Sequence, residues 1–258
     1  MLDLLQYAPA FLLILTRVSS FFITLPLFSH RTIPAFFKVG LAFFLTWLMF
    51  FTIDPAIIEI DGLYFLLIMK EAIVGLTVGL IAMVMMYAIQ VAGGFIDIKM
   101  GFMIANVIDP QTGAQSPLTG GYLYTFALLF LLAIDAHHLL LDGIFYSYQF
   151  IPLEQIYLPF SNEAILTHFI KTFTTMFFIA FQMAMPIVGC LFLVDVALGM
   201  IARAVPQVNV FVIGFPIKIF VGFVILILAM PAFFMVTKQL VQQMILAMRT
   251  LMQLYGGM

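Results

Sequence analysis

The chain has 258 residues, of which 65% are hydrophobic and 9% are charged, and its formal net charge is −2. A mean hydropathy of +1.20, with 30 phenylalanines, is more apolar than a soluble core of this length can hide, so the composition excludes a soluble globular protein and indicates an integral membrane protein. The lysines and arginines are scattered singly, which leaves nucleic-acid binding without support, and one cysteine excludes an intramolecular disulfide.

Six apolar segments are predicted along the chain, because about 20 apolar residues cross a bilayer as a helix. They cover residues 8–28, 36–53, 63–96, 122–150, 164–194 and 208–236. Proline, glycine or charged residues mark the breaks between them, and no break is long enough to fold separately. We therefore expect an all-α integral membrane protein with a single membrane-embedded domain over residues 1–258.

Arg17 lies near the middle of the first segment, about 15 Å from either end at the rise of an α-helix. This is farther than an arginine side chain comfortably reaches toward water. The side chain should therefore face protein or water rather than lipid. Two interpretations remain open: Arg17 fixes packing through a buried carboxylate or carbonyl groups, or it lines an aqueous conduit.

The third segment, 63–96, is too long for lipid alone, since its helix would measure about 50 Å against a hydrocarbon core of about 30 Å. The Lys70–Glu71 pair inside it predicts that part of this helix is covered by protein. Gly75 and Gly79 have the spacing that lets two helices approach closely.

Residues 106–121 form a polar stretch rich in Asn, Asp, Gln, Thr, Ser, Pro and Gly between two long apolar segments. Non-helical backbone at membrane depth is tolerated only where protein buries it or water adjoins it. The composition alone is also typical of an ordinary extramembrane turn.

The motif DAHHLLLDG (135–143) would place Asp135 with His138, and His138 with Asp142, on one helix face. Zinc needs three or four converging ligands, usually from more than one segment, so we expect structural hydrogen bonding here and no metal. No nucleophile elbow, phosphate-binding glycine loop or paired-carboxylate arrangement is present, so no enzymatic activity is predicted.

The basic residues disagree with six full crossings. Arg31, Lys38 and Arg203 indicate cytoplasmic loops and an N-terminus outside, whereas Lys238 and Arg249 place the tail inside. Six crossings would return the chain to the side where it began. Two explanations remain open: the disagreement is chance among few charges, or one segment is re-entrant or does not cross, as in a subunit of a larger assembly.

The most specific pattern lies in residues 201–223, where a proline and two amides precede an apolar run that contains a cation. Pro206 begins a helix or ends a loop, and Gly214 and Pro216 are expected to weaken the helix that follows. The pattern predicts protein contacts at an aqueous interface. Its residues are Arg203, Pro206, Gln207, Asn209, Gly214, Pro216 and Lys218.

At these positions the chain resembles the FliR family of export-gate subunits of the bacterial flagellar type III secretion system. That family carries Ala-Arg-x-x-Pro-Gln-x-Asn-x-Phe followed by Gly-x-Pro-x-Lys, and it is similar at Arg17, Glu71, DPQTGAQSP (109–117) and DAHHLLLDG. The homologous injectisome subunit shares the Arg-x-x-Pro-Gln-x-Asn block. Gly214, ahead of Phe215 and Pro216, favours the flagellar branch.

The resemblance implies a subunit that assembles with FliP and FliQ into a gate in the bacterial inner membrane at the flagellar basal body. FlhB and FlhA would associate with this gate, unfolded flagellar subunits would pass through it, and no cofactor is implied. Alternatives are the injectisome subunit and a secondary transporter that uses Arg17 and Lys218, although the two matching interrupted halves of a transporter are not visible. An intramembrane enzyme built on DAHHLLLDG is the third alternative.

The resemblance also implies that the polar stretch plugs the closed channel. Glycines would allow a passing chain to displace this loop. The plug residues expected on this basis are Met103, Asn106, Asp109, Pro110, Gln111, Gly113, Gln115, Gly120 and Gly121.

Overall fold

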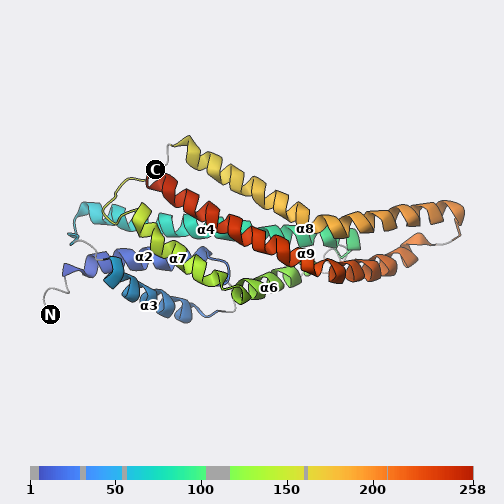
Figure 1. The fold of residues 1–258 in the computed structure, drawn as a ribbon, viewed down its shortest axis with the longest axis horizontal. Coiled ribbons are helices and arrows are strands. Elements are labelled where there is room, and N and C mark those ends of the chain that lie inside the picture. Colours follow the sequence, from blue (N-terminus) through green and yellow to red (C-terminus); the bar gives the residue numbers. More distant parts are fainter. Residues whose placement is uncertain are drawn as a thin grey trace. The chain divides into compact units, whose positions relative to one another are not determined.

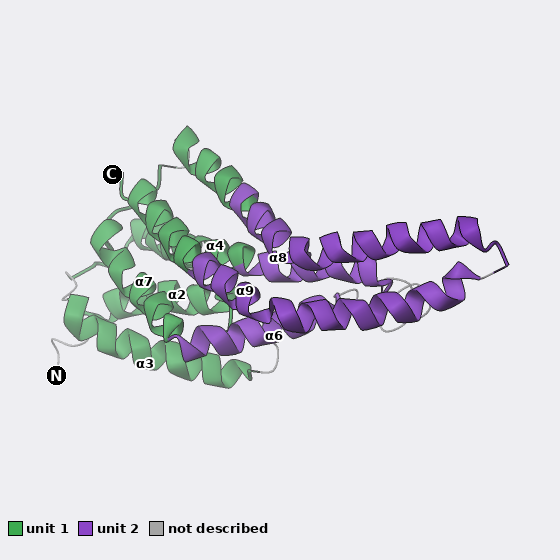
Figure 2. Ribbon diagram, turned by 45° about the vertical axis from the view of Figure 1, so that its right-hand side comes forward, with its two compact units in different colours: residues 1–85, 135–173, 242–258 green, residues 86–134, 174–241 purple. Residues whose placement is uncertain are grey.

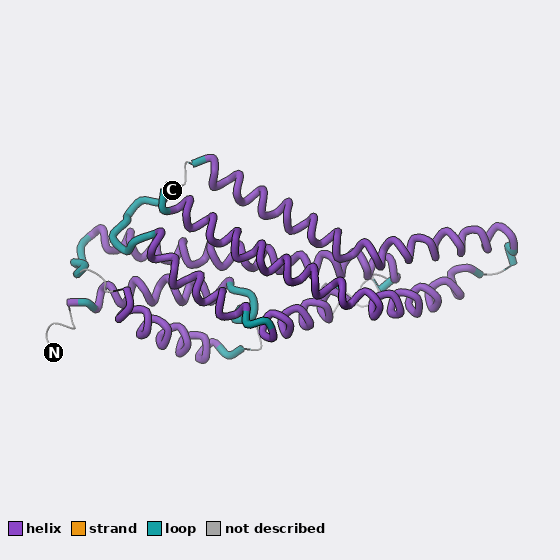
Figure 3. The backbone as a smooth tube through the Cα atoms, viewed as in Figure 1, coloured by secondary structure: helices purple, strands orange, loops and turns teal. Residues whose placement is uncertain are grey.

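The computed structural model describes residues 6–29, 33–53, 57–102, 117–159, 162–207 and 209–257. Within these ranges every regular element is an α-helix (Figure 3). The all-α prediction is confirmed. The helices labelled in Figure 1 are α2 (Ala8–Thr24), α3 (Ala35–Ile53), α4 (Gly62–Met100), α6 (Leu118–Ala133), α7 (Ala136–Phe150), α8 (Glu163–Ala204) and α9 (Val210–Tyr255).

The described helices account for all six predicted segments. Helices α3, α4, α8 and α9 are each long and apolar enough to cross a membrane, and α2 is a shorter apolar helix. The predicted segment 122–150 is broken: α6 and α7 form a bent pair that is either one broken span or a re-entrant loop. Asp135 at the break has a φ of 56°, an uncommon left-handed conformation for a residue with a β-carbon. The chain therefore turns here instead of continuing as one helix.

The last two helices are longer than the sequence predicts. The predicted break at 195–207 begins only after Ala204, because residues 195–204 are mostly good helix formers and Asp195 is ion-paired. Helix α9 continues past residue 236 to Tyr255. At 1.5 Å per residue, α8 and α9 measure about 63 and 69 Å along their axes, roughly twice the thickness of a hydrocarbon core.

The chain groups into two compact units (Figure 2). Unit 1 contains residues 1–85, 135–173 and 242–258, and unit 2 contains residues 86–134 and 174–241. Helices α4, α8 and α9 contribute residues to both units. The expectation of a single membrane-embedded domain stays a prediction.

In unit 1, α2 packs directly against α4 through two glycines. A β-carbon at Gly75 would collide with Ser20 Oγ and the carbonyl oxygen of Arg17, and one at Gly79 would lie 2.9 Å from the carbonyl oxygen of Phe21. The prediction that these glycines permit close helix packing is confirmed.

Polar side chains cap the N-termini of three of the helices. The Oδ1 atoms of Asp61, Asn162 and Asn209 accept hydrogen bonds from backbone N–H groups at the starts of α4, α8 and α9, at distances of 2.9 to 3.1 Å for the shortest in each case. Helix α4 ends at Met100 and is followed by Gly101, whose φ of 91° suits glycine. These residues fix where the long helices begin and where α4 ends.

Candidate functional site

Arg17 is fully buried in unit 1 and is held by a carboxylate from another helix. Its Nε and Nη2 atoms both donate to the Glu71 carboxylate, with an Nη2 to Oε1 distance of 2.9 Å. Nη1 donates to Ser147 Oγ at 3.0 Å, and Nη2 also donates to the carbonyl oxygen of Ile151 at 2.9 Å. The ring of Tyr148 lies 3.9 Å from Arg17 Cζ. Because Nε, Nη1 and Nη2 all donate hydrogen bonds, the orientation of the planar guanidinium is fixed.

Lys70 brings a second buried cation to the same carboxylate. Its ammonium pairs with Glu71 and donates to the carbonyl oxygens of Pro152 and Leu153, both at 3.1 Å. The cluster therefore contains two cations and one carboxylate. Three successive carbonyl groups, at residues 151–153, and the Tyr148 ring offset the excess positive charge.

This buried charge cluster, defined as Arg17, Lys70, Glu71, Ser147 and Tyr148, ties α2, α4 and α7 together. Arg17 has the buried carboxylate and carbonyl partners that the packing interpretation expects. The Arg17 side chain has no exposed surface within this chain, and its alternative role in a conduit of an assembly stays a prediction. The prediction that protein covers the Lys70–Glu71 part of α4 is confirmed. Sequence reasoning missed Ser147 and Tyr148, since neither residue type marks an arginine partner.

In unit 2, a second buried carboxylate joins α4 to the start of α6. Both oxygens of Asp97 accept the Thr119 backbone N–H at 3.2 Å, and Oδ1 also accepts the Thr119 hydroxyl. Next to it, Gly93 and Gly120 approach so closely that a β-carbon on Gly93 would collide with the Gly120 backbone. This α4–α6 junction holds together the two helices that flank residues 103–116.

The expected plug residues fall into two groups. Met103, Asn106, Asp109, Pro110, Gln111, Gly113 and Gln115 lie outside the described residues. Gly120 and Gly121 were expected in the loop, and this is wrong: both lie in the first turn of α6, which begins directly after Pro117. Gly120 serves helix packing there, since its missing side chain makes room for α4.

The α8 and α9 segments of unit 2 form a helical hairpin, running side by side in Figures 1 and 2. Asp195 on α8 pairs with Lys218 on α9, and Lys99 of α4 lies 3.6 Å from the same carboxylate. These three side chains are 25–36% exposed. Lys218, the cation within the apolar run, is therefore partly exposed.

The other residues of the 201–223 pattern lie at or near the turn of the hairpin. Arg203 is exposed in the last turn of α8, and Pro206 and Gln207 form the exposed turn that follows. Asn209 caps α9, since its Oδ1 accepts the backbone N–H of Phe211. Gly214 is buried, and a β-carbon there would lie 3.2 Å from Leu198 Cδ1, so this glycine brings the two arms close together. Helix α9 continues through Pro216 without interruption.

Large apolar side chains cover the outside of the hairpin. Phe211 is 79% exposed and Phe220 is 70% exposed. Other exposed apolar residues on these arms include Val196, Met200, Val212, Ile213, Ile227 and Leu228. Exposed apolar area on this scale marks contact with lipid or with another protein.

The DAHHLLLDG motif does bring Asp135 and His138 together. Ligand atoms of Asp135, His137 and His138 lie within 4.8 Å of one another, whereas Asp142 is not part of this group. All three come from one turn of the chain, and Asp135 and His138 are exposed. A structural zinc site uses four ligands, usually from more than one segment, so we assign no metal to this group.

Comparison with known proteins gives a family and several relatives. The family described as "Bacterial export proteins, family 1" matches residues 8–244. The chain is 54% identical to the flagellar biosynthetic protein FliR of Bacillus subtilis (strain 168), over 98% of each chain. It is 27% identical to the protein of the same name from Escherichia coli (strain K12), over 84% of this chain and 82% of that one. The Yop proteins translocation protein T of Yersinia pestis is 28% identical over 84% of each chain. None of these names describes an enzyme.

Proposed function

Since the chain belongs to the bacterial export proteins, family 1, we propose that it is a subunit of the flagellar type III secretion export gate in the bacterial inner membrane. The observation that carries the proposal is the likeness to a flagellar relative along almost its whole length. In the described part of the chain, four or five helices are long and apolar enough to span a membrane, which supports a multi-pass membrane protein.

Within this proposal, FliP and FliQ are the partners that complete the gate, FlhB and FlhA associate with it, and unfolded flagellar subunits are its cargo. The exposed apolar faces support a role in an assembly. Helix α3 buries only Ala42, Thr46 and Met49, and the outer face of the hairpin in unit 2 is mostly apolar. A long apolar face without a partner favours association.

The proposal gives residues 106–117 the role of the plug that closes the channel. The α4–α6 junction supports this role, because Asp97 and Thr119 join the helices on both sides of the segment. Deleting Pro110 to Ser116 should raise ion leakage through the assembled gate. Replacing the same seven residues with glycine and serine keeps the length of the loop. This control separates the effect of loop length on leakage from the effect of loop sequence. Unchanged conductance after the deletion would contradict the plug.

Complementation tests the proposed function directly. The chain should restore secretion of flagellin in Bacillus subtilis that lacks its own FliR. Detection of a tagged copy in the membrane fraction shows that the protein reaches the membrane. A strain that keeps its native gene gives the full level of flagellin secretion for comparison. A chain that accumulates in the membrane and restores no secretion would contradict an export role.

The secondary transporter finds no support in the site. All the nitrogen atoms of Arg17 donate to protein groups, and Lys218 pairs with Asp195, so neither cation is available to a solute. We therefore propose no second function.

A further inference from the structure

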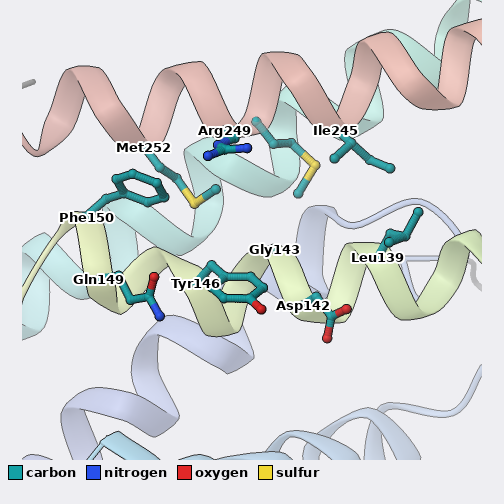
Figure 4. A pocket seen from close by; sticks show the side chains of 10 residues that line it. Leu139, Asp142, Gly143, Tyr146, Gln149, Phe150, Ile245, Arg249 and Met252 are labelled. Carbon is teal, nitrogen blue, oxygen red and sulfur yellow. The ribbon is translucent and has the colours of Figure 1, made fainter.

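A groove of about 320 Å³ lies between α7 and the C-terminal part of α9, within unit 1 (Figure 4). Its apolar lining is formed by Leu139 and Phe150 of α7 and by Ile245, Met248 and Met252 of α9. The residue between these helices at the narrow point is Gly143, where a β-carbon would lie 3.4 Å from Met248 Cε. The volume is that of a small-molecule site, which typically measures about 300–1,000 Å³.

Two opposite charges line the same groove, one on each helix. Asp142 comes from α7 and Arg249 from α9, and both are exposed. Among the described residues, neither side chain has a hydrogen-bond or ion-pair partner, in contrast to Arg17 and Lys218. A charge beside an apolar surface is stabilised when a ligand of opposite charge binds it. A ligand that carries both signs would complement both side chains.

The chemistry of the groove restricts that ligand to an amphiphile. An apolar body would cover the floor, an anion would bind the Arg249 guanidinium, and a cation with N–H donors would bind the Asp142 carboxylate. Phosphate is a preferred partner of arginine because the planar fork can bind two of its oxygens. An anionic phospholipid would leave Asp142 facing a like charge. A quaternary ammonium headgroup cannot donate a hydrogen bond.

We propose that this groove binds phosphatidylethanolamine, with the phosphate on Arg249, the ammonium on Asp142 and part of an acyl chain on the apolar floor. A lipid in this position bridges α7 and α9 and stabilises their contact. The site is independent of the proposed export function, and its test does not depend on secretion.

Native mass spectrometry of the full chain in detergent tests the proposal. The protein, extracted with whichever subunits accompany it, is stripped of lipid and titrated with dioleoyl phosphatidylethanolamine, phosphatidylglycerol and phosphatidylcholine at equal concentrations. We expect the ethanolamine lipid to bind about tenfold more tightly than either of the others, which corresponds to about one charge-assisted hydrogen bond.

Single substitutions separate the two charges. Asp142→Asn should remove the preference for the ethanolamine lipid over the glycerol lipid, and Arg249→Gln should weaken binding of all three lipids. Gly143→Leu should fill the groove and abolish binding. Glu163→Gln and Lys238→Gln are matched controls, because both are exposed helical charges outside the groove, and they should leave binding unchanged.

Several results would overturn the proposal. Equal or tighter binding of phosphatidylglycerol would remove the role of Asp142, and binding that survives both charge substitutions would place the lipid elsewhere. Crosslinking from Gln149→Cys to another polypeptide in membranes would show that a protein, not a lipid, occupies the groove. If Gly143→Leu fails to fold, the two charge variants still decide the outcome.

Discussion

Each compact unit contains a cluster of three charged side chains that come from more than one helix, and the two clusters differ in burial. In unit 1, Arg17, Lys70 and Glu71 are buried, and protein groups satisfy all three. In unit 2, Lys99, Asp195 and Lys218 are partly exposed and lie on a hairpin with an apolar outer face. Removing water from a charge is costly unless partners replace it. The charge cluster of unit 1 is therefore complete within one chain, whereas the charged side chains of the hairpin in unit 2 keep part of their surface exposed.

The largest expected effect comes from removing the one carboxylate of the buried charge cluster. Glu71→Gln leaves the Arg17 and Lys70 cations buried without a counter-charge, which should cost about 3–5 kcal/mol of the free energy of unfolding. Thermal unfolding of the purified protein in detergent measures this loss of stability. Glu59→Gln, at an exposed carboxylate, is the control. Equal stability of the two variants would mean that the cluster is not what holds unit 1 together.

A second prediction tests the close packing of α2 on α4. Gly75→Ala puts a methyl group into Ser20 and the Arg17 backbone, and overpacking of this kind costs about 1–3 kcal/mol or more. Gly40→Ala is a matched helical glycine in the same unit with nothing within 4 Å, and it should stabilise α3 by about 0.5–1 kcal/mol. Chemical unfolding in detergent compares the two. Gly75→Ala with the stability of the unmodified chain would contradict the close approach.

The buried Asp97 of unit 2 should behave like a milder version of Glu71. Thr119→Val removes the hydroxyl that donates to Asp97, and a carboxylate that loses one of its buried donors should cost about 1–3 kcal/mol. Thr125→Val, at an exposed threonine of the same helix, should change the stability by less than about 0.5 kcal/mol. The unfolding midpoints of the two variants are measured side by side. Equal midpoints would contradict a stabilising contact between Thr119 and Asp97 at the α4–α6 junction.

The smallest effect on stability should come from the partly exposed charges of the hairpin. Asp195→Asn removes two ion pairs in contact with solvent, and such pairs contribute about 0–1 kcal/mol. The unfolding midpoint should shift far less than for Glu71→Gln. A loss of stability as large as that of Glu71→Gln would end the contrast between the two units.

The positions of the helices could be predicted from the sequence better than the residues that contact one another between helices. The six apolar segments, and the expectation that Arg17 faces protein or water rather than lipid, follow from composition and helix length alone. The identity of the partners does not, since Ser147 lies 130 residues away and Ile151 contributes only a carbonyl group. Contacts of this kind depend on tertiary packing, which leaves no periodic signal in one sequence.

Boundaries were wrong where a local rule competed with a tertiary contact. Asp195 looks like the end of an apolar segment, yet its pairing with Lys218 lets α8 continue to Ala204. Gly120 and Gly121 look like loop residues, but Gly120 lies in α6 because Gly93 of α4 approaches it there. In both places a residue that usually breaks a helix serves contact between two helices.

The native mass of the assembled protein tests the central claim, that unit 2 is completed by partner subunits, most directly. The tagged chain would be co-expressed with FliP and FliQ, extracted in detergent and weighed intact. We predict a hetero-oligomer that contains both partners and is far heavier than the 29.0 kDa chain. A stable monomer or homodimer that leaves both partners behind would contradict the account.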